Sequence, residues 1–321
     1  MSLPASNAFP RSAFVGSLAA AALWPRPGAA QALTPLRATS AIDDPATPYL
    51  YAMESGLFRK NGFDASIERA TSGAAAASAV VGGSFDVGKS SIVSLLSAHV
   101  HGLPIVAVAA AGDYDASKPT AAIAVRADST LRTGADLNGK TIAVSALNDL
   151  FSIAMRAWID AHGGDSSTVK LLELPTSSVA LALTAGRIDA AVMIQPFLGQ
   201  ALSNGSVKSI GDPVGALGNH HTDSAWFMTT AYTQKNPDAV NRFMRTIRDA
   251  AIYVNGHHAE TSYLLTKFAM VQSSDVVKLR TLQGTRLDAA NLQGMIDAAA
   301  RYKVIAERFD AKDLIYQNAL H

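Results

Sequence analysis

VGGSFDVG at residues 81–88 and AGRIDAA at residues 185–191 mark the same structural step twice in one chain. Each follows an apolar stretch with helical spacing, turns at glycine, and enters a short apolar strand through an aspartate. A strand, a helix, a second strand and a second helix precede each copy in the pattern of apolar residues. Two such units in 321 residues predict two α/β lobes with a cleft between them, and clefts of this kind bind small solutes.

The remaining chain continues this alternation of strands and helices. We expect strands at residues 33–39, 64–69, 85–87, 105–110, 120–125, 141–145, 169–174, 189–194 and 224–229. We expect helices from Pro48 to Gly56 or Gly62, from Ser90 or Ser91 to His101, from Pro196 onward, and at residues 73–81, 150–161, 178–185, 238–254, 259–268, 274–281 and 287–301. The predicted fold class is α/β, with two mostly parallel sheets flanked by helices.

Composition narrows the classes of function. The chain is 49% hydrophobic and 17% charged with a net charge of +1, which is typical of a globular protein and gives no sign of nucleic-acid binding. It contains no cysteine, which excludes disulfides, a thiol nucleophile, a cysteine-ligated metal and a lipid-modified cysteine. The sequence shows no catalytic constellation or metal-ligand spacing, so we expect neither an enzyme nor a cofactor.

Residues 1–32 have the pattern of a signal peptide. Arg11 precedes an apolar segment from Ala13 to Trp24, and AQA at residues 30–32 is a small-x-small cleavage site. Removal of this segment leaves 25 basic and 26 acidic residues. The pattern predicts Sec-type export to a bacterial periplasm. The alternative is an apolar N-terminal helix that packs on the domain.

Candidate binding residues follow the predicted strands, because ligands in open α/β sheets bind beyond the carboxyl ends of the strands. Hydroxyl groups recur there beside predicted helix N-termini, where backbone N–H groups attract anions. Each serine could equally be a plain N-cap. Lys89 could pair with a carboxylate or sulfonate, or be solvated. The candidates of this kind are Ser72, Gly73, Lys89, Ser90 and Ser91 in the first unit, and Ser145, Asn148, Ser177 and Gln195 in the second.

A second set of candidates favours a different ligand. Asp43 and Asp44 follow the first strand, where a carboxylate could hold an amine or a ring N–H, or simply form a solvated turn. Tyr49 could form an aromatic wall beside a planar ligand. The pairs His220–His221 and His257–His258 fit no metal spacing, and we expect them in surface loops.

Three segments resemble a known family in the same order. Residues 51–63 (YAMESGLFRKNGF) are similar to its "A…GLFKKEGL" segment, residues 136–144 (DLNGKTIAV) to "DLKGKKIAV", and residues 186–197 to "G.vDA…EPf". The chain therefore resembles the type II periplasmic substrate-binding proteins of ABC importers, in the subgroup that binds taurine, aliphatic sulfonates, nitrate and thiamine-precursor pyrimidines. Gln195 departs from the glutamate usual in that family, which weakens any binding of a cation there.

The resemblance implies an architecture and a function. Lobe 1 would comprise residues 33–119 plus 225–321 and lobe 2 residues 120–224, with two hinge crossings near Ala121–Val125 and Ala225–Met228. The protein would be a monomeric receptor that captures a small organic anion, a sulfonate or carboxylate, and delivers it to a membrane permease. The alternatives are a binder of a nitrogen heterocycle such as a thiamine-precursor pyrimidine, an enzyme resembling the pyrimidine synthases, and a regulatory ligand-sensing domain.

Overall fold

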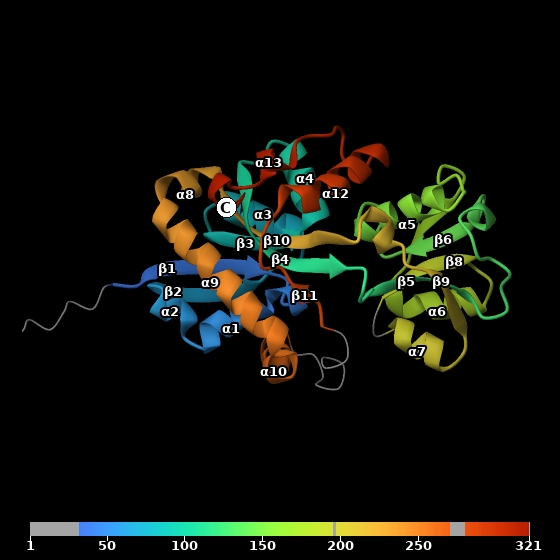
Figure 1. The fold of residues 1–321 in the computed structure, drawn as a ribbon, viewed down its shortest axis with the longest axis horizontal. Coiled ribbons are helices and arrows are strands. Elements are labelled where there is room, and N and C mark those ends of the chain that lie inside the picture. Colours follow the sequence, from blue (N-terminus) through green and yellow to red (C-terminus); the bar gives the residue numbers. More distant parts are fainter. Residues whose placement is uncertain (1–31, 195–196, 270–279, 321) are drawn as a thin grey trace, which may run out of the picture. The chain divides into compact units, whose positions relative to one another are not determined.

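Two separate β-sheets organise the chain in a computed structural model, which describes residues 32–194, 197–269 and 280–320 (Figure 1). The first sheet has the strand order β11-β4-β10-β3-β1-β2 and the second has the order β7-β6-β8-β5-β9. The strands are β1 (Thr34–Ser40), β2 (Phe63–Arg69), β3 (Val87–Ser91), β4 (Ile105–Asp115), β5 (Ala121–Arg126), β6 (Thr141–Val144), β7 (Lys170–Glu173), β8 (Ala190–Ile194), β9 (Val207–Gly211), β10 (His220–Thr229) and β11 (Leu282–Gln283).

Helices connect the strands and cover the sheets. They are η1 (Asp44–Ala46), α1 (Thr47–Glu54), α2 (Leu57–Lys60), α3 (Gly73–Val81), α4 (Ile92–Val100), η2 (Ala135–Leu137), α5 (Leu150–Ala161), α6 (Thr176–Thr184), α7 (Phe197–Ser203), η3 (Val214–Leu217), α8 (Thr230–Lys235), α9 (Pro237–Gly256), α10 (His258–Ala269), α12 (Ala289–Arg301), α13 (Ala311–Leu314) and η4 (Gln317–Leu320). None of the helices in the described part of the chain has the length and hydropathy that a membrane span requires.

The first sheet is buried on both faces. On one face, α1 and α9 contribute Tyr49 and Phe243 to a cluster around Trp226 of β10, and Figure 1 shows α9 lying across this sheet. On the other face, α4 and α12 pack against the sheet through residues such as Leu96 and Leu292. The second sheet is likewise packed by α5 on one face and by α6 and α7 on the other. Burial on both faces explains why the strands have nearly continuous apolar runs in the sequence.

The α/β fold class with two flanked sheets is confirmed, but the strand directions need a correction. β1 is parallel to β2 and β3, and β6 is parallel to β7 and β8. β10 runs antiparallel to β3 and β4, and β5 runs antiparallel to β8 and β9. Each sheet is therefore mixed, because a strand that enters directly from the other sheet runs against its new neighbours.

The expected positions of the crossings are also wrong by a few residues. Ala121–Val125 lies inside the second sheet and Ala225–Met228 lies inside the first. The chain passes from β4 to β5 through residues 116–120 and returns from β9 to β10 through residues 212–219. The two apolar runs mark strands inside the sheets rather than the connections between the sheets. The lobe boundaries themselves remain a prediction.

Most other elements lie where the pattern predicts them. The helices at residues 73–81 and 150–161 are confirmed, and Gly56 and Gly62 adopt positive φ angles of 75° and 81°, as expected after helix ends. β9 and β11 were not predicted. The expected helix at residues 274–281 falls largely outside the described residues, as do almost all of the predicted signal peptide and Gln195.

Candidate functional site

The carboxyl ends of three neighbouring strands form one edge of the first sheet. β1, β2 and β3 are parallel, so their last residues, Ser40, Arg69 and Ser91, lie at the same edge. Two helices of nine residues, α3 and α4, begin directly beyond it. The sequence expectation that helix N-termini gather at this edge is confirmed.

Serines cap both of these helices. The Ser72 hydroxyl accepts a hydrogen bond from the backbone N–H of Ala75 at 3.1 Å, and the Ser91 hydroxyl accepts one from the N–H of Ser94 at 3.2 Å. Ser91 also donates to the hydroxyl of Ser94 at 2.9 Å. A serine cap satisfies one of the four free N–H groups at a helix start, and the others keep their partial positive charge.

Ser90 lies between the two helix starts and differs from the capping serines. It is only 4% exposed, and its hydroxyl has no hydrogen-bond partner among the described residues. A Cβ atom added to Gly73 would lie 2.0 Å from this hydroxyl and 3.2 Å from the hydroxyl of Ser94. Gly73 therefore lets the start of α3 approach Ser90 closely. An unpaired buried hydroxyl costs stability, and a ligand that accepts its hydrogen bond would recover that cost.

Lys89 is paired with a carboxylate. Its side chain is 3% exposed, and its Nζ lies 2.8 Å from one carboxylate oxygen of Asp43 and 3.0 Å from the other. This ion pair joins two candidates that the sequence assigned to ligands of opposite charge. Lys89 is therefore not a free cation. The negative charge of Asp43, which is exposed, is neutralised by this ion pair.

Asp44 and Tyr49 are engaged by other parts of the protein, so neither side chain is left free for a ligand. Asp44 accepts hydrogen bonds from Nε of Arg280 at 2.8 Å and from the N–H of Thr281 at 2.6 Å. The Tyr49 ring is fully buried and stacks on Trp226, with its hydroxyl donating to the carbonyl of Ser66. Burial raises the pKa of Tyr49 above its ordinary value. Nothing in the local sequence signals Arg280, which is distant along the chain.

The corresponding edge of the second sheet is polar and more exposed. Ser145 follows β6 and donates to the carboxylate of Asp149 at 2.5 Å, while Asp149 caps α5 through the N–H of Ser152. Burial is the main cause that raises the pKa of Asp149. Asn148 is exposed in this loop, and Ser177 is exposed in the first turn of α6. The carboxylate of Asp149 already occupies the N-terminus of α5. A bound anion would therefore be stabilised less at this edge than at the edge of the first sheet.

A buried polar cluster between β4 and β10 was missed by the sequence analysis. Asp113 is buried, and loss of hydration raises its pKa to about 6. His220 lies 3.7 Å from this carboxylate, and His221 is buried against the ring of Tyr114 with Nε2 3.1 Å from Asp223. The expectation that His220 and His221 lie in a surface loop is wrong, because both belong to β10. The alternation of side chains along that strand buries His221 and leaves His220 exposed.

The other polar groups give no sign of a metal centre. Within the described ranges, no three or more His, Asp or Glu side chains gather closely enough to hold a metal ion. His257 is the C-cap residue that follows α9, and His258 begins α10, so this pair joins two helices rather than lying in a longer surface loop. The edge formed by β1, β2 and β3 offers hydroxyl and backbone N–H donors to a ligand. Such donors suit a ligand that has several acceptor oxygens.

Comparisons with known proteins identify the family and the fold. The family model described as NMT1/THI5 like matches residues 45–261. A Brucella abortus (strain 2308) protein whose name proposes a binding protein is 25% identical over 285 residues, covering 82% of this chain and 83% of that protein.

Two solved structures share the fold. The periplasmic aliphatic sulphonate binding protein SsuA from Escherichia coli superposes with a TM-score of 0.72 at 21% identity, covering 89% of this chain and 99% of that one. The periplasmic nitrate-binding protein NrtA from Synechocystis PCC 6803 gives a TM-score of 0.66 at 16% identity, covering 90% and 87%. By their names, the first of these proteins binds aliphatic sulphonates and the second binds nitrate.

Proposed function

Because this chain belongs to the NMT1/THI5-like family, we propose that it is the periplasmic substrate-binding protein of an ABC importer, and that it binds a small organic anion. The anion is a sulfonate or carboxylate held where α3 and α4 begin. The buried hydroxyl of Ser90, which has no partner among the described residues, is the observation that carries this proposal. The fold shared with sulfonate-binding and nitrate-binding proteins supports it.

The donors at this edge define the chemistry of recognition. An oxygen of the anion would accept from the Ser90 hydroxyl and from free N–H groups in the first turns of α3 and α4. Each helix N-terminus stabilises a nearby anion by about 0.3–1 kcal/mol, and by up to about 2 kcal/mol when partly buried. Gly73 has no side chain, so the backbone at the start of α3 can reach the ligand.

The same contacts argue against a nitrogen heterocycle. A heterocycle with N–H groups would need a free carboxylate, and the aromatic wall would need an accessible tyrosine. Asp43 is paired with Lys89, Asp44 is paired with Arg280, and Tyr49 is fully buried. An anion is therefore the better match for this site.

Transport would depend on contacts between the ligand and both lobes. In this proposal, lobe 2 contributes Ser145, Asn148 and Ser177 once the two crossings let it close over the anion. A ligand that contacts both lobes only in the closed state shifts the population toward that state. The closed monomer would then dock on the permease. The protein would not change its ligand chemically.

A thermal-shift panel tests this function. Residues 33–321, which form one compact unit, would be heated with an alkanesulfonate, an aromatic sulfonate, an aromatic carboxylate, nitrate or an aminopyrimidine. An anion at about 100 times its dissociation constant should add about 2.7 kcal/mol of stability, which raises Tm by several degrees. A rise with the aminopyrimidine alone would contradict the anion assignment. Turnover of a panel compound would contradict the receptor.

A further inference from the structure

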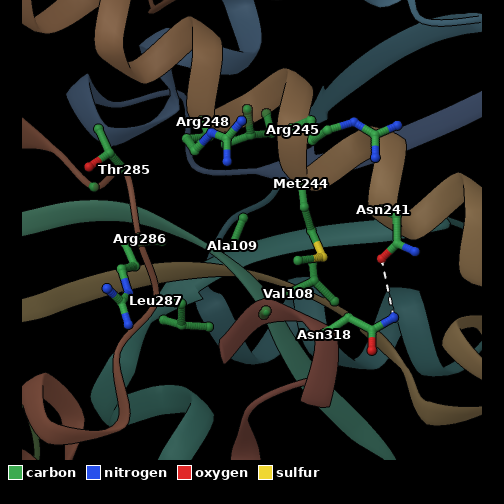
Figure 2. Close-up of a pocket in the computed structure, with 14 residues that line it drawn as sticks. Val108, Ala109, Asn241, Met244, Arg245, Arg248, Thr285, Arg286, Leu287 and Asn318 are labelled. Atoms are coloured by element: carbon green, nitrogen blue, oxygen red, sulfur yellow. Dashed lines mark hydrogen bonds between the residues drawn. The ribbon is translucent and has the colours of Figure 1, made fainter. Parts of the chain in front are cut away.

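A concave site lies on the first sheet, on the side of α9. A pocket of about 290 Å³ is bounded by α9, by β4, by residues 284–287 and by the C-terminal η4. Figure 2 shows Arg245 and Arg248 on α9 and Arg286 on the segment that leads into α12. None of the residues that line this pocket belongs to the Ser90 site.

The charged side chains that line this pocket are all positive. It contains three arginines and no acidic residue. The guanidinium group of Arg245 forms no hydrogen bond or ion pair with any described residue. The carboxylates that approach Arg248 and Arg286 are those of Asp249 at 3.5 Å and Asp288 at 3.8 Å, and all four of these side chains are substantially exposed. Exposed pairs at such distances hold their partners weakly, so the three guanidinium groups are available to a ligand.

Apolar side chains form the floor beneath the arginines. Val108 and Ala109 of β4 are buried there, together with Leu287, and Met244 of α9 lies beside them (Figure 2). On another side, the side-chain amide of Asn318 donates to that of Asn241 at 3.3 Å and links η4 to α9. The pocket thus combines an apolar floor with a cationic rim, and these two parts come from segments far apart in the sequence.

We propose that this pocket is a second binding site for an organic anion with an apolar body. Guanidinium groups bind sulfonate, carboxylate or phosphate oxygens through paired, charge-assisted hydrogen bonds. An aromatic or branched apolar body of the same ligand would lie against the half-buried Met244 and this apolar floor. The site is separate from the proposed transport function, so either proposal can fail alone.

A fluorescent aromatic sulfonate, 8-anilinonaphthalene-1-sulfonate, is a suitable probe for this site. The purified protein would be titrated with it at low ionic strength, in parallel with the double variant Arg248→Gln/Arg286→Gln. The matched control is Arg132→Gln/Arg187→Gln, which removes the same charge from two exposed arginines outside the pocket. We expect saturable binding by the wild type and the control, and binding weaker by about tenfold or more in the pocket variant.

Three results would overturn the proposal. The first is an absence of saturable binding to the wild type. The second is equal affinity of the wild type, the pocket variant and the control. The third is loss of the probe in Ser90→Ala, which would place the dye in the Ser90 site instead. Circular dichroism of each variant checks that the fold is intact.

Discussion

Single buried residues decide which ligand chemistry this molecule can offer. The sequence correctly indicated that serines, an aspartate and a lysine gather at strand ends. It could not indicate which of them are already partnered, because Lys89 meets Asp43 across 46 positions and Asp44 meets Arg280 across 236 positions. Tyr49 was misjudged because the first turn of α1 faces Trp226 rather than solvent. Pairing and burial depend on the complete fold.

The Asp113 carboxyl predicts a pH dependence of stability. Its pKa of about 6 in the folded protein lies above the value near 3.9 of an unfolded chain. Stability from this group is therefore fully present below about pH 4 and is lost as pH rises through 6, by roughly 2–3 kcal/mol. Urea unfolding between pH 4 and pH 7.5 should show this loss in the wild type and not in Asp113→Asn.

Asp115 on the same strand is the control for this measurement. Hydrogen bonds from Ser117 hold the pKa of its carboxyl below the ordinary value, so its contribution has the opposite sign and is lost as pH falls. Asp115→Asn should keep the wild-type loss of stability between pH 4 and pH 7.5. The titratable groups that act on the Asp113 carboxyl are His220, His221 and Asp223. An identical pH profile for Asp113→Asn and the wild type would show that this carboxyl is not the cause.

At the scale of elements, glycine and proline residues made several helix and strand boundaries predictable. Gly56, Gly62 and Gly83 adopt positive φ angles at turns, and α3 and α5 have the predicted bounds. The two-residue β11 was missed because so short a strand has no periodicity of its own. It pairs with β4 through tertiary contacts that no local pattern shows.

The start of α3 gives a prediction about Gly73. An alanine there would force the Ser90 hydroxyl, 2.0 Å from the new Cβ, into another rotamer. Gly73→Ala should therefore weaken anion binding by about tenfold, as the loss of one hydrogen bond would. In a Ser90→Ala background, the same change should weaken binding less, because the added methyl group no longer displaces the Ser90 hydroxyl. Calorimetric titration of the four proteins in this double-mutant cycle measures the coupling.

Gly256 provides the control for that cycle. It lies at the end of α9, and an added Cβ would meet nothing within 4 Å. Gly256→Ala should leave anion binding unchanged. Additive effects of the Gly73 and Ser90 substitutions would contradict the close approach of α3 to Ser90.

The ion pair between Arg280 and Asp44 links the residue two positions before β11 to the start of η1. The Arg280 side chain is 3% exposed and also donates to the carbonyl of His258 at 2.8 Å. Arg280→Met leaves a largely buried carboxylate without its cation, which should cost about 3–5 kcal/mol in the free energy of unfolding. Denaturant unfolding against Arg59→Met, whose pair with Asp64 is exposed, measures the difference. Equal stability of these variants would show that the pair is not a structural fastening.

At the scale of the whole molecule, the repeated strand–helix pattern was enough to predict two sheets. It was not enough to predict their strand directions, because β5 and β10 enter each sheet directly from the other. The paths of these two strands also shift the crossings to residues 116–120 and 212–219. The sequence thus predicted the fold class, while the directions of the strands that pass between the sheets required the structure.

The central claim is that an anion binds at the Ser90 hydroxyl, and one calorimetric comparison tests it most directly. The anion with the largest thermal shift would be titrated into the wild type, Ser90→Ala and the control Ser78→Ala, whose serine is exposed on α3. Ser90→Ala should fold with equal or greater stability, since it removes an unpaired buried hydroxyl, and bind the anion about tenfold or more weakly. Unchanged affinity in Ser90→Ala, or no anion that binds the wild type, would contradict the account.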